Sequence, residues 1–181
     1  MGGREVGFMA GMMKQLSNRA DCLFTGKGLS FGGSLIRPEV TGYGTVYCAE
    51  EMLKQTGRSL DGLRVSVSGS GNVAQYAVEK AMALGAKVVT VSDSSGTVVD
   101  EDGFTAGKLA EPMNVKNHHY GRVSDYAKRV GLDFLSGQRP WHVPVDVALP
   151  CATQNEPNAE DAATLIKNGC SIDARPKLLT M

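Results

Sequence analysis

The chain has 181 residues, of which 42% are hydrophobic, and its 19 basic and 19 acidic residues give a formal net charge of zero. This length and composition are typical of one globular domain with its own core. The balanced charge gives no indication of nucleic-acid or anionic-membrane binding. No hydrophobic run reaches the roughly 20 residues of a membrane-spanning helix. We therefore expect neither a nucleic-acid nor a membrane partner.

The four cysteines form no Cys-x-x-Cys pair and no regular disulfide framework; they are Cys22, Cys48, Cys151 and Cys170. Unpaired thiols are typical of a reducing compartment, so we expect a cytoplasmic protein. The early Arg4 and Glu5 argue against a signal peptide. The three histidines lack the spacing of a ligand motif, and we expect no metal site.

Two helices are expected before residue 60. Hydrophobic residues recur every three or four positions from Gly7 to Leu16, which predicts the first helix. The glycine-punctuated stretch 22–37 predicts an irregular loop. The second helix is expected from Pro38 to Leu53, with Thr41 as the candidate N-cap.

A strand, a glycine turn, a helix and a second strand are predicted between Arg64 and Asp93. The turn, Gly69-Ser70-Gly71-Asn72-Val73-Ala74, has the pattern G-x-G-x-x-A. In such turns the first glycine permits a tight bend, the second lets a pyrophosphate approach the backbone, and the last small residue lets the helix pack on the strand. Asp93 ends the second strand roughly 20 positions later, where an acidic residue meets a ribose hydroxyl. The alternative is an ordinary βαβ unit whose helix N-terminus holds no ligand.

The rest of the chain continues the alternation of strands and helices. We expect a strand and turn over 96–103, a weak helix over 104–115, a helix from Val123 to Val130, and strands over 132–135 and 144–149. Asn158 should cap a last helix that ends near Lys167. Residues 170–181 have no clear period and predict a loosely held tail. Together these elements predict a Rossmann-like α/β fold with a mostly parallel open sheet and helices on both faces.

Six stretches of the sequence resemble the hexameric, NADP-dependent glutamate dehydrogenases: GGREVGFM, FTGKGLSFGGSLIRPEVTGYG, RVSVSGSGNVAQYAVEKA, SDSSGTVVDEDGF, GRVSDYAK and VPVDVALPCATQNE. They extend from about Gly2 to about Asn168. The resemblance implies an N-terminal interdomain helix over 1–20, a Rossmann-like dinucleotide-binding domain over 21–169 that is incomplete at its C-terminal end, and a divergent tail over 170–181.

The same resemblance implies cofactor-binding residues: Thr41, Gly69, Gly71, Asn72, Ala74, Asp93, Ser94, Lys116, Thr153 and Asn155. Thr41 would contact the nicotinamide end. Asp93 and Ser94 would lie around the adenosine ribose, and Lys116 beside a 2′-phosphate.

The residues near Asp93 bear on the choice of cofactor. An aspartate at the end of the second strand, taken alone, favours NAD, because it accepts the ribose 2′-hydroxyl. Ser94 and Ser95 can instead donate to a 2′-phosphate, and Lys116 and Arg122 can supply positive charge. The alternative for these two basic residues is a solvated surface pair. We expect NADP, with NAD the less favoured cofactor.

For the intact enzyme, the resemblance implies a homo-oligomer that converts L-glutamate reversibly into 2-oxoglutarate and ammonium. The catalytic lysine and aspartate of the family have no counterpart in these residues, so we expect no catalytic residue in this chain. A fragment of this kind should not turn over glutamate by itself, because hydride transfer requires substrate and cofactor in one geometry. Two alternatives stay open: a non-catalytic dinucleotide-binding module, and a relative that acts on leucine, phenylalanine or valine.

Overall fold

The computed structural model describes residues 3–19, 21, 23–105, 107–108 and 121–175. The chain divides into two units, residues 1–40 and residues 41–181, and each is described by itself. Most of the helix predicted over 104–115 lies outside the described residues. The predicted site residue Lys116 also lies outside them. Within the described ranges, no helix has the length and hydrophobicity needed to cross a membrane.

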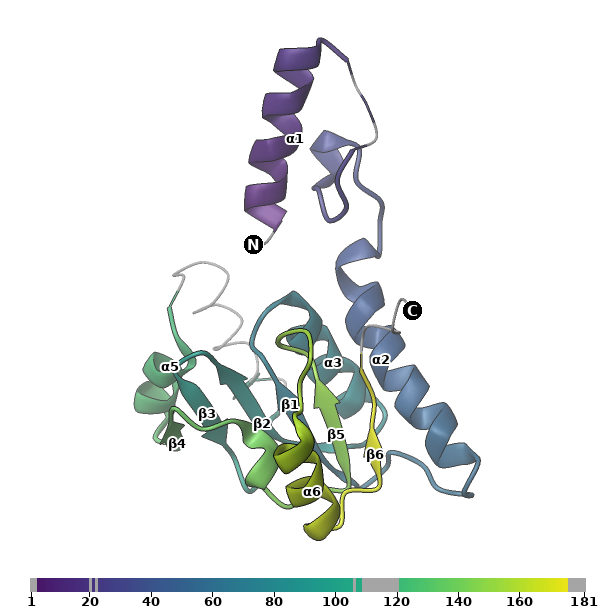
Figure 1. Ribbon diagram of the computed structural model, residues 1–181, viewed down its shortest axis with the longest axis vertical. Coiled ribbons are helices and arrows are strands. Elements are labelled where there is room, and N and C mark those ends of the chain that lie inside the picture. The colour runs from purple at the N-terminus through teal and green to yellow at the C-terminus, as the bar shows by residue number, and fades with distance from the viewer. Residues whose placement is uncertain (1–2, 20, 22, 106, 109–120, 176–181) are drawn as a thin grey trace. The chain divides into compact units, whose positions relative to one another are not determined.

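The first unit contains the helix α1 (Gly3–Ser17) and a single turn of 3-10 helix, η1 (Leu29–Phe31), which contacts it (Figure 1). The predicted N-terminal helix is confirmed and begins four residues earlier than the hydrophobic spacing indicated. Glu5 in its first turn and Lys14 in its last turn complement the helix dipole. The predicted irregular loop is confirmed over its described residues apart from η1 and Arg37, which begins the next helix.

The second unit is built on a six-stranded sheet with the order β4-β3-β2-β1-β5-β6 (Figure 1). Its strands are β1 (Arg64–Ser68), β2 (Lys87–Asp93), β3 (Gly96–Val99), β4 (Asp133–Ser136), β5 (Val147–Pro150) and β6 (Ile172–Asp173). Three strand pairs are parallel: β2 with β1, β1 with β5, and β5 with β6. β3 pairs antiparallel with both β2 and β4. The prediction of a mostly parallel open sheet is therefore confirmed.

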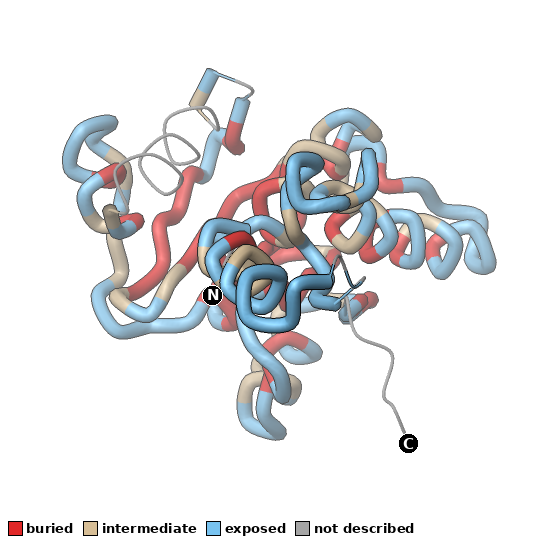
Figure 2. The backbone as a smooth tube through the Cα atoms, turned by 90° about the horizontal axis from the view of Figure 1, so that it is seen from above, coloured by how far each residue is buried: buried red, intermediate tan, exposed pale blue. Residues whose placement is uncertain are grey.

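Helices cover both faces of this sheet: α2 (Arg37–Lys54), α3 (Asn72–Ala83), α5 (Val123–Val130), η2 (Pro140–His142) and α6 (Ala159–Lys167). Residues of α2, α3 and α5 form one core cluster with Val65, Val67 and Leu149 of the central strands. Trp141 of η2 and Leu165 of α6 form a second cluster with Ala148, which points to the opposite face. Nearly every residue of β1, β2 and β5 is buried, so both faces of these strands are covered; buried residues are red in Figure 2.

The prediction of a loosely held tail is wrong for residues 172–174. Ile172 and Asp173 form β6, which pairs in parallel with Val147 and Ala148 of β5. The side chains of Ile172 and Ala174 are only 8% and 2% exposed. Two strand residues are too few to produce a hydrophobic period, so sequence patterning does not detect a strand whose main support is its neighbour.

The expectation that Thr41 caps a helix is also wrong. α2 begins at Arg37, and Thr41 lies inside it, where its carbonyl oxygen accepts a hydrogen bond from the Thr45 hydroxyl at 2.9 Å. Pro38 near the start suits the first turn, because its fixed φ is helical and its missing N–H has no intrahelical partner there. The last helix is as predicted: Asn158 Oδ1 accepts from the Asp161 backbone N–H at 2.8 Å.

Candidate functional site

Three segments leave the same edge of the sheet, at the carboxyl ends of β1, β2 and β5. They are residues 69–72 after β1, residues 94–95 after β2 and residues 151–156 after β5. The order of the sheet reverses at β1, because β2 lies on one side of it and the later strand β5 on the other. In open α/β sheets, ligands bind at such a switch point, outside the carboxyl ends of the strands.

Gly69 is required by the fold. Its φ is +92°, a conformation that side chains with a Cβ rarely adopt. A Cβ at this position would also lie 3.1 Å from both Ala152 Cα and the Cys151 carbonyl oxygen. The turn after β1 therefore packs directly against the loop after β5. Ser92 of β2 holds Gly69 from the other side, accepting its N–H at 2.9 Å and donating its own N–H to the Gly69 carbonyl at 3.1 Å.

Gly71 differs from Gly69 in both respects. Its φ of −81° and ψ of −172° are extended values that any residue adopts, and no heavy atom lies within 4 Å of a Cβ built there. It is the N-cap of α3, and no side chain caps this helix end. The first amides of a helix lack internal partners and attract anions. The missing side chain therefore leaves open space beside this helix end.

The helix α2 packs against the first turn of α3 at Gly42. A Cβ on Gly42 would lie 2.6 Å from the Val73 carbonyl oxygen, so only a glycine lets the two helices approach this closely. The half-buried Thr41 directly precedes Gly42 in α2, and the exposed Asn72 directly precedes Val73 in α3. Ala74 is 1% exposed and lies in the core with Val65 and Val67 of β1. The close approach at Gly42 therefore places α2 against the first turn of α3, which follows the glycine turn.

A second group of predicted residues lies at the end of β2. The exposed Arg122 donates through Nη1 to the Ser94 hydroxyl at 2.8 Å. This contact joins two segments that are 28 positions apart in the chain. The pair therefore presents a hydroxyl and a guanidinium group on the surface beside Asp93, a combination that suits a phosphate.

Asp93 has a structural role that its sequence position does not indicate. Its Oδ1 accepts from the Ser95 backbone N–H at 2.7 Å and from the Ser95 hydroxyl at 2.5 Å. Its Oδ2 accepts from the backbone N–H of Val123, at the start of α5, at 3.0 Å. The carboxylate thus fixes the β2–β3 turn and anchors α5. A carboxylate has about four acceptor positions, so a ribose hydroxyl remains compatible with these contacts.

Thr153 and Asn155 lie in the loop after β5, and both are exposed. Asn155 has a φ of +64°, in the left-handed region that asparagine tolerates better than most residues. The contact between Gly69 and Ala152 places this loop against the glycine turn. Two residues that sequence reasoning missed hold the loop: Ser68, which ends β1, and Glu156. Both side chains are polar and buried in the structure, and no spacing in the sequence indicates their contact.

Burial raises the pKa of the Cys151 thiol to about 12, and the nearby Glu156 carboxylate adds to the effect. A thiol with this pKa stays protonated near neutral pH, so Cys151 does not supply a nucleophile beside the glycine turn. Among the described residues, no group of three His, Cys, Asp or Glu side chains is placed to hold a metal ion.

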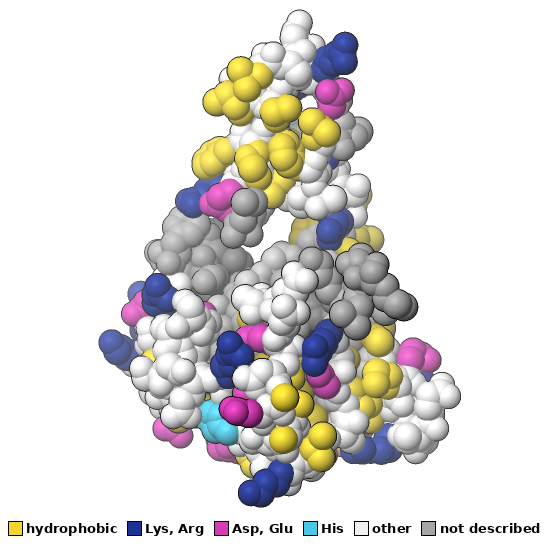
Figure 3. Space-filling view, in the orientation of Figure 1, with side chains coloured by type: hydrophobic (Ala, Val, Ile, Leu, Met, Phe, Trp, Pro, Cys, Tyr) yellow, Lys and Arg dark blue, Asp and Glu magenta, His cyan; other side chains and the backbone are white. Residues whose placement is uncertain are grey.

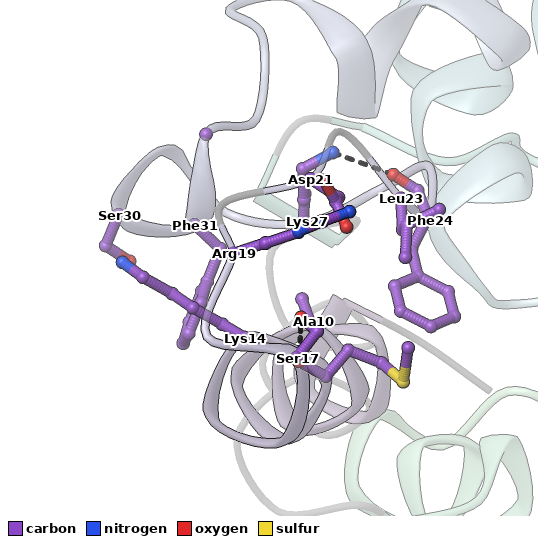
Figure 4. Close-up of a pocket in the computed structure, with 12 residues that line it drawn as sticks. Ala10, Lys14, Ser17, Arg19, Asp21, Leu23, Phe24, Lys27, Ser30 and Phe31 are labelled. Atoms are coloured by element: carbon purple, nitrogen blue, oxygen red, sulfur yellow. Dashed lines mark hydrogen bonds between the residues drawn. The ribbon is translucent and has the colours of Figure 1, made fainter.

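A separate pocket of about 250 Å³ lies within the first unit (Figure 4). Lys14, Arg19 and Lys27 line it together with Asp21 and hydrophobic side chains. Lys27 Nζ donates to the Phe24 carbonyl oxygen at 2.8 Å, as the figure shows. None of its lining residues belongs to the glycine turn or to the loops after β2 and β5. We therefore do not count it as part of the site.

The sheet order and the glycine turn between β1 and α3 define an α/β domain of the nucleotide-binding, doubly wound class. The family model described as Glutamate/Leucine/Phenylalanine/Valine dehydrogenase matches residues 32–173. The chain belongs to this family.

Individual relatives agree with this assignment. The chain is 68% identical over 169 residues to the NADP-specific glutamate dehydrogenases of Salmonella typhimurium and Escherichia coli. It is 63% identical to that of Haemophilus influenzae over 174 residues. The alignments to the first two cover 93% of this chain but only 38% of the relatives. The chain thus spans well under half the length of the curated relatives it matches.

A solved structure gives the same result for the fold. The crystal structure of a Plasmodium falciparum glutamate dehydrogenase superposes with a TM-score of 0.87 at 40% sequence identity. This superposition covers 97% of the present chain and 38% of that one. The resemblance to glutamate dehydrogenases stated from the sequence is confirmed, and so is the α/β fold.

Proposed function

We propose that this chain forms the cofactor-binding part of an NADP-dependent glutamate dehydrogenase. The observation that carries the proposal is the difference between the two glycines of the turn. Gly69 is needed for the fold, whereas the glycine at position 71 leaves open space at the N-terminus of α3. Binding of a dinucleotide pyrophosphate in that space would explain why a glycine stands at position 71.

The residues proposed to hold the dinucleotide divide among its parts. Gly69, Gly71 and Ala74 form the pyrophosphate turn and its packing. Thr41, Asn72, Thr153 and Asn155 are proposed for the nicotinamide side, and Asp93 and Ser94 for the adenosine ribose. When bound, NADP supplies the hydride acceptor of glutamate oxidation, and the role of these residues is to bind and orient it.

We propose NADP rather than NAD because of the surface beside the adenosine ribose. The contact between Ser94 and Arg122 offers both a hydroxyl and a positive charge to a 2′-phosphate. Both oxygens of Asp93 already accept hydrogen bonds from within the protein, which reduces its preference for a ribose hydroxyl. The names of the 68%-identical relatives support the same cofactor. Lys116, outside the described residues, stays a predicted contact of the 2′-phosphate.

For the whole protein we propose the reversible conversion of glutamate into 2-oxoglutarate and ammonium, in a homo-oligomer. The relatives' names support this substrate. The exposed hydrophobic side chains of the first unit support further protein contacts: Phe8, Leu16 and Leu35 are 69%, 75% and 75% exposed, and Figure 3 shows hydrophobic atoms gathered over α1. The described cysteines are free, which is consistent with the proposed cytoplasmic location.

A chimera tests the enzyme-level proposal. In the Escherichia coli relative, the stretch that aligns with this chain would be replaced by the aligned residues of this chain. We expect the chimera to oxidise glutamate with NADP and poorly with NAD. A folded, assembled chimera without glutamate activity would overturn the proposal. Activity on leucine, phenylalanine or valine in place of glutamate would favour the alternative substrates.

A further inference from the structure

Ser68 connects the two ends of the loop after β5. Its hydroxyl is fully buried and accepts from the Cys151 backbone N–H at 3.0 Å and from the Ala152 N–H at 3.3 Å. The same hydroxyl donates to Glu156 Oε2 at 2.9 Å. One side chain at the end of β1 therefore holds both the beginning and the end of residues 151–156.

Glu156 is a buried carboxylate, 8% exposed. Among the described residues, Arg139 is the cation that lies near it, with Nε 3.9 Å from Glu156 Oε1, and Arg139 also lies 3.4 Å from the Asp161 carboxylate. An exposed, shared cation at this distance compensates little of the cost of burying a charge. Within the part of the chain that the structure describes, the hydrogen bond from Ser68 is therefore the main directional contact of this carboxylate. A hydrophobic contact would join β1 to the loop at lower cost, but without fixing the loop's geometry.

The loop held in this way faces one side of the glycine turn. Thr153 and Asn155 are exposed between its two fixed ends, and Ala152 lies against Gly69. The Ser94–Arg122 pair lies at the end of β2, on the other side of β1. A dinucleotide with its pyrophosphate at Gly71 therefore has its adenosine half toward β2 and its nicotinamide half toward the loop after β5.

We propose that Ser68 and Glu156 are positioning residues, which fix the loop 151–156 for the nicotinamide half of the dinucleotide. This inference rests on the proposed cofactor function. Neither residue contacts the cofactor in this account. They act through the loop backbone, so their loss should affect the nicotinamide half and leave the adenosine half unchanged.

The test compares Glu156→Ala with Glu156→Gln in the 181-residue chain, each titrated with NADPH and with 2′,5′-ADP, which represents only the adenosine half. Glu156→Gln keeps an acceptor oxygen for the Ser68 hydroxyl. We expect Glu156→Ala to lower NADPH affinity about tenfold or more, the effect of losing a hydrogen bond to a charged group, and Glu156→Gln to stay within about threefold. Both variants should bind 2′,5′-ADP as tightly as the wild type.

Arg139→Ala is the matched control, because it removes the distant cation and leaves the Ser68 hydrogen bond in place; its NADPH affinity should stay near that of the wild type. Fluorescence of the single tryptophan, Trp141, reports folding, since this side chain is 1% exposed. If Glu156→Ala does not fold, Glu156→Asp replaces it in the test. The aspartate side chain is one methylene shorter, so its carboxylate should not reach the Ser68 hydroxyl, and the same NADPH-specific loss is expected.

Unchanged NADPH affinity in folded Glu156→Ala and Glu156→Asp would overturn the inference and leave the cofactor proposal standing. An equal loss of NADPH and 2′,5′-ADP affinity would also overturn it, because it would show a general effect on the domain. If the folded wild type binds neither compound, the cofactor proposal itself fails, and this inference fails with it.

Discussion

Gly69 and Gly71 stand two positions apart in one turn, but the fold requires a glycine only at position 69. A Cβ on Gly69 would meet Ala152 and Cys151 at 3.1 Å, whereas a Cβ on Gly71 would meet no atom within 4 Å. The φ of Gly69 is +92°, which favours glycine, whereas the φ of Gly71 is −81°, which any residue adopts. This difference separates the role of folding from the role of binding within a single sequence motif.

The first prediction follows from that difference. Gly71→Val should leave the free energy of unfolding within about 1 kcal/mol of the wild type, because the change affects only an exposed N-cap position. It should abolish NADPH binding, because the side chain fills the space of the pyrophosphate. Denaturant unfolding and calorimetric titration measure the two effects. Gly69→Ala is the contrasting variant and should be clearly destabilised, by about 1–2 kcal/mol for the left-handed backbone alone. Normal NADPH affinity in Gly71→Val would mean that the turn is structural only.

The crossing of α2 and α3 gives a second prediction. Gly42→Ala should destabilise the chain by about 1–3 kcal/mol, because its Cβ would meet the Val73 carbonyl oxygen at 2.6 Å and the helices would have to separate. Gly44→Ala in the same helix is the control. No atom lies within 4 Å of its Cβ, so it should be neutral or stabilising. Thermal unfolding would measure both, and equal melting temperatures would show that the helices do not pack this closely.

Arg122 should determine cofactor preference. Arg122→Ala should lower NADPH affinity about tenfold or more and leave NADH affinity nearly unchanged, because only NADPH has a 2′-phosphate for the guanidinium group. Arg129→Ala removes another exposed arginine, at the far end of α5, and should change neither affinity. Parallel titrations with both cofactors provide the comparison. Equal losses for NADPH and NADH would exclude a role for Arg122 in recognising the phosphate.

Asp93 should matter for stability as well as for binding. Asp93→Ala removes the acceptors of the Ser95 and Val123 backbone N–H groups, and we expect it to lower the free energy of unfolding by about 1–3 kcal/mol. If Asp93 also accepts a ribose hydroxyl, NADH affinity should fall more than NADPH affinity. Asp133→Ala, at an exposed position of β4, is the control for charge removal. A variant as stable as the wild type would contradict the structural role.

The Cys151 thiol makes stability depend on alkaline pH. Its pKa is about 12 in the folded chain against an ordinary value of 9.0, because burial disfavours the thiolate. The folded state therefore keeps a proton that the unfolded state loses above about pH 9, so the free energy of unfolding should fall by up to about 1.4 kcal/mol per pH unit between about pH 9 and 12. Urea unfolding of the wild type and Cys151→Ala across this range isolates the effect. Parallel pH profiles would contradict it.

The order of the elements could be predicted from the sequence because hydrophobic periodicity and the glycine turn are local signals. β1, α3 and β2 appear where the pattern Arg64–Asp93 indicated them. The start of α2 was predicted to within one residue, but Thr41 was wrongly taken as its N-cap, because threonine is a common N-cap residue; Pro38 is the better signal of the first turn. β6 was missed because its support comes from β5, a contact that no local pattern contains.

The residues of the candidate site could be predicted only where they belong to a sequence motif, as in the glycine turn. Valine and serine alternate in β1, which is typical of a strand with one exposed face. In the structure Ser68 is fully buried, and its hydroxyl binds a loop more than 80 positions away in the sequence. Spacing cannot reveal such a partner. For the same reason the contacts of Asp93 with Ser95 and Val123 become visible only once the chain is folded.

The central claim is that this chain binds NADP at the glycine turn, and calorimetric titration of the purified 181-residue chain with NADPH, with NADH in parallel, tests it most directly. We predict saturable binding of one cofactor per chain, with NADPH preferred because of the Ser94–Arg122 pair. Folded, soluble chain that binds neither cofactor would contradict the claim. Saturable binding that prefers NADH would keep the dinucleotide site and contradict the assignment of NADP.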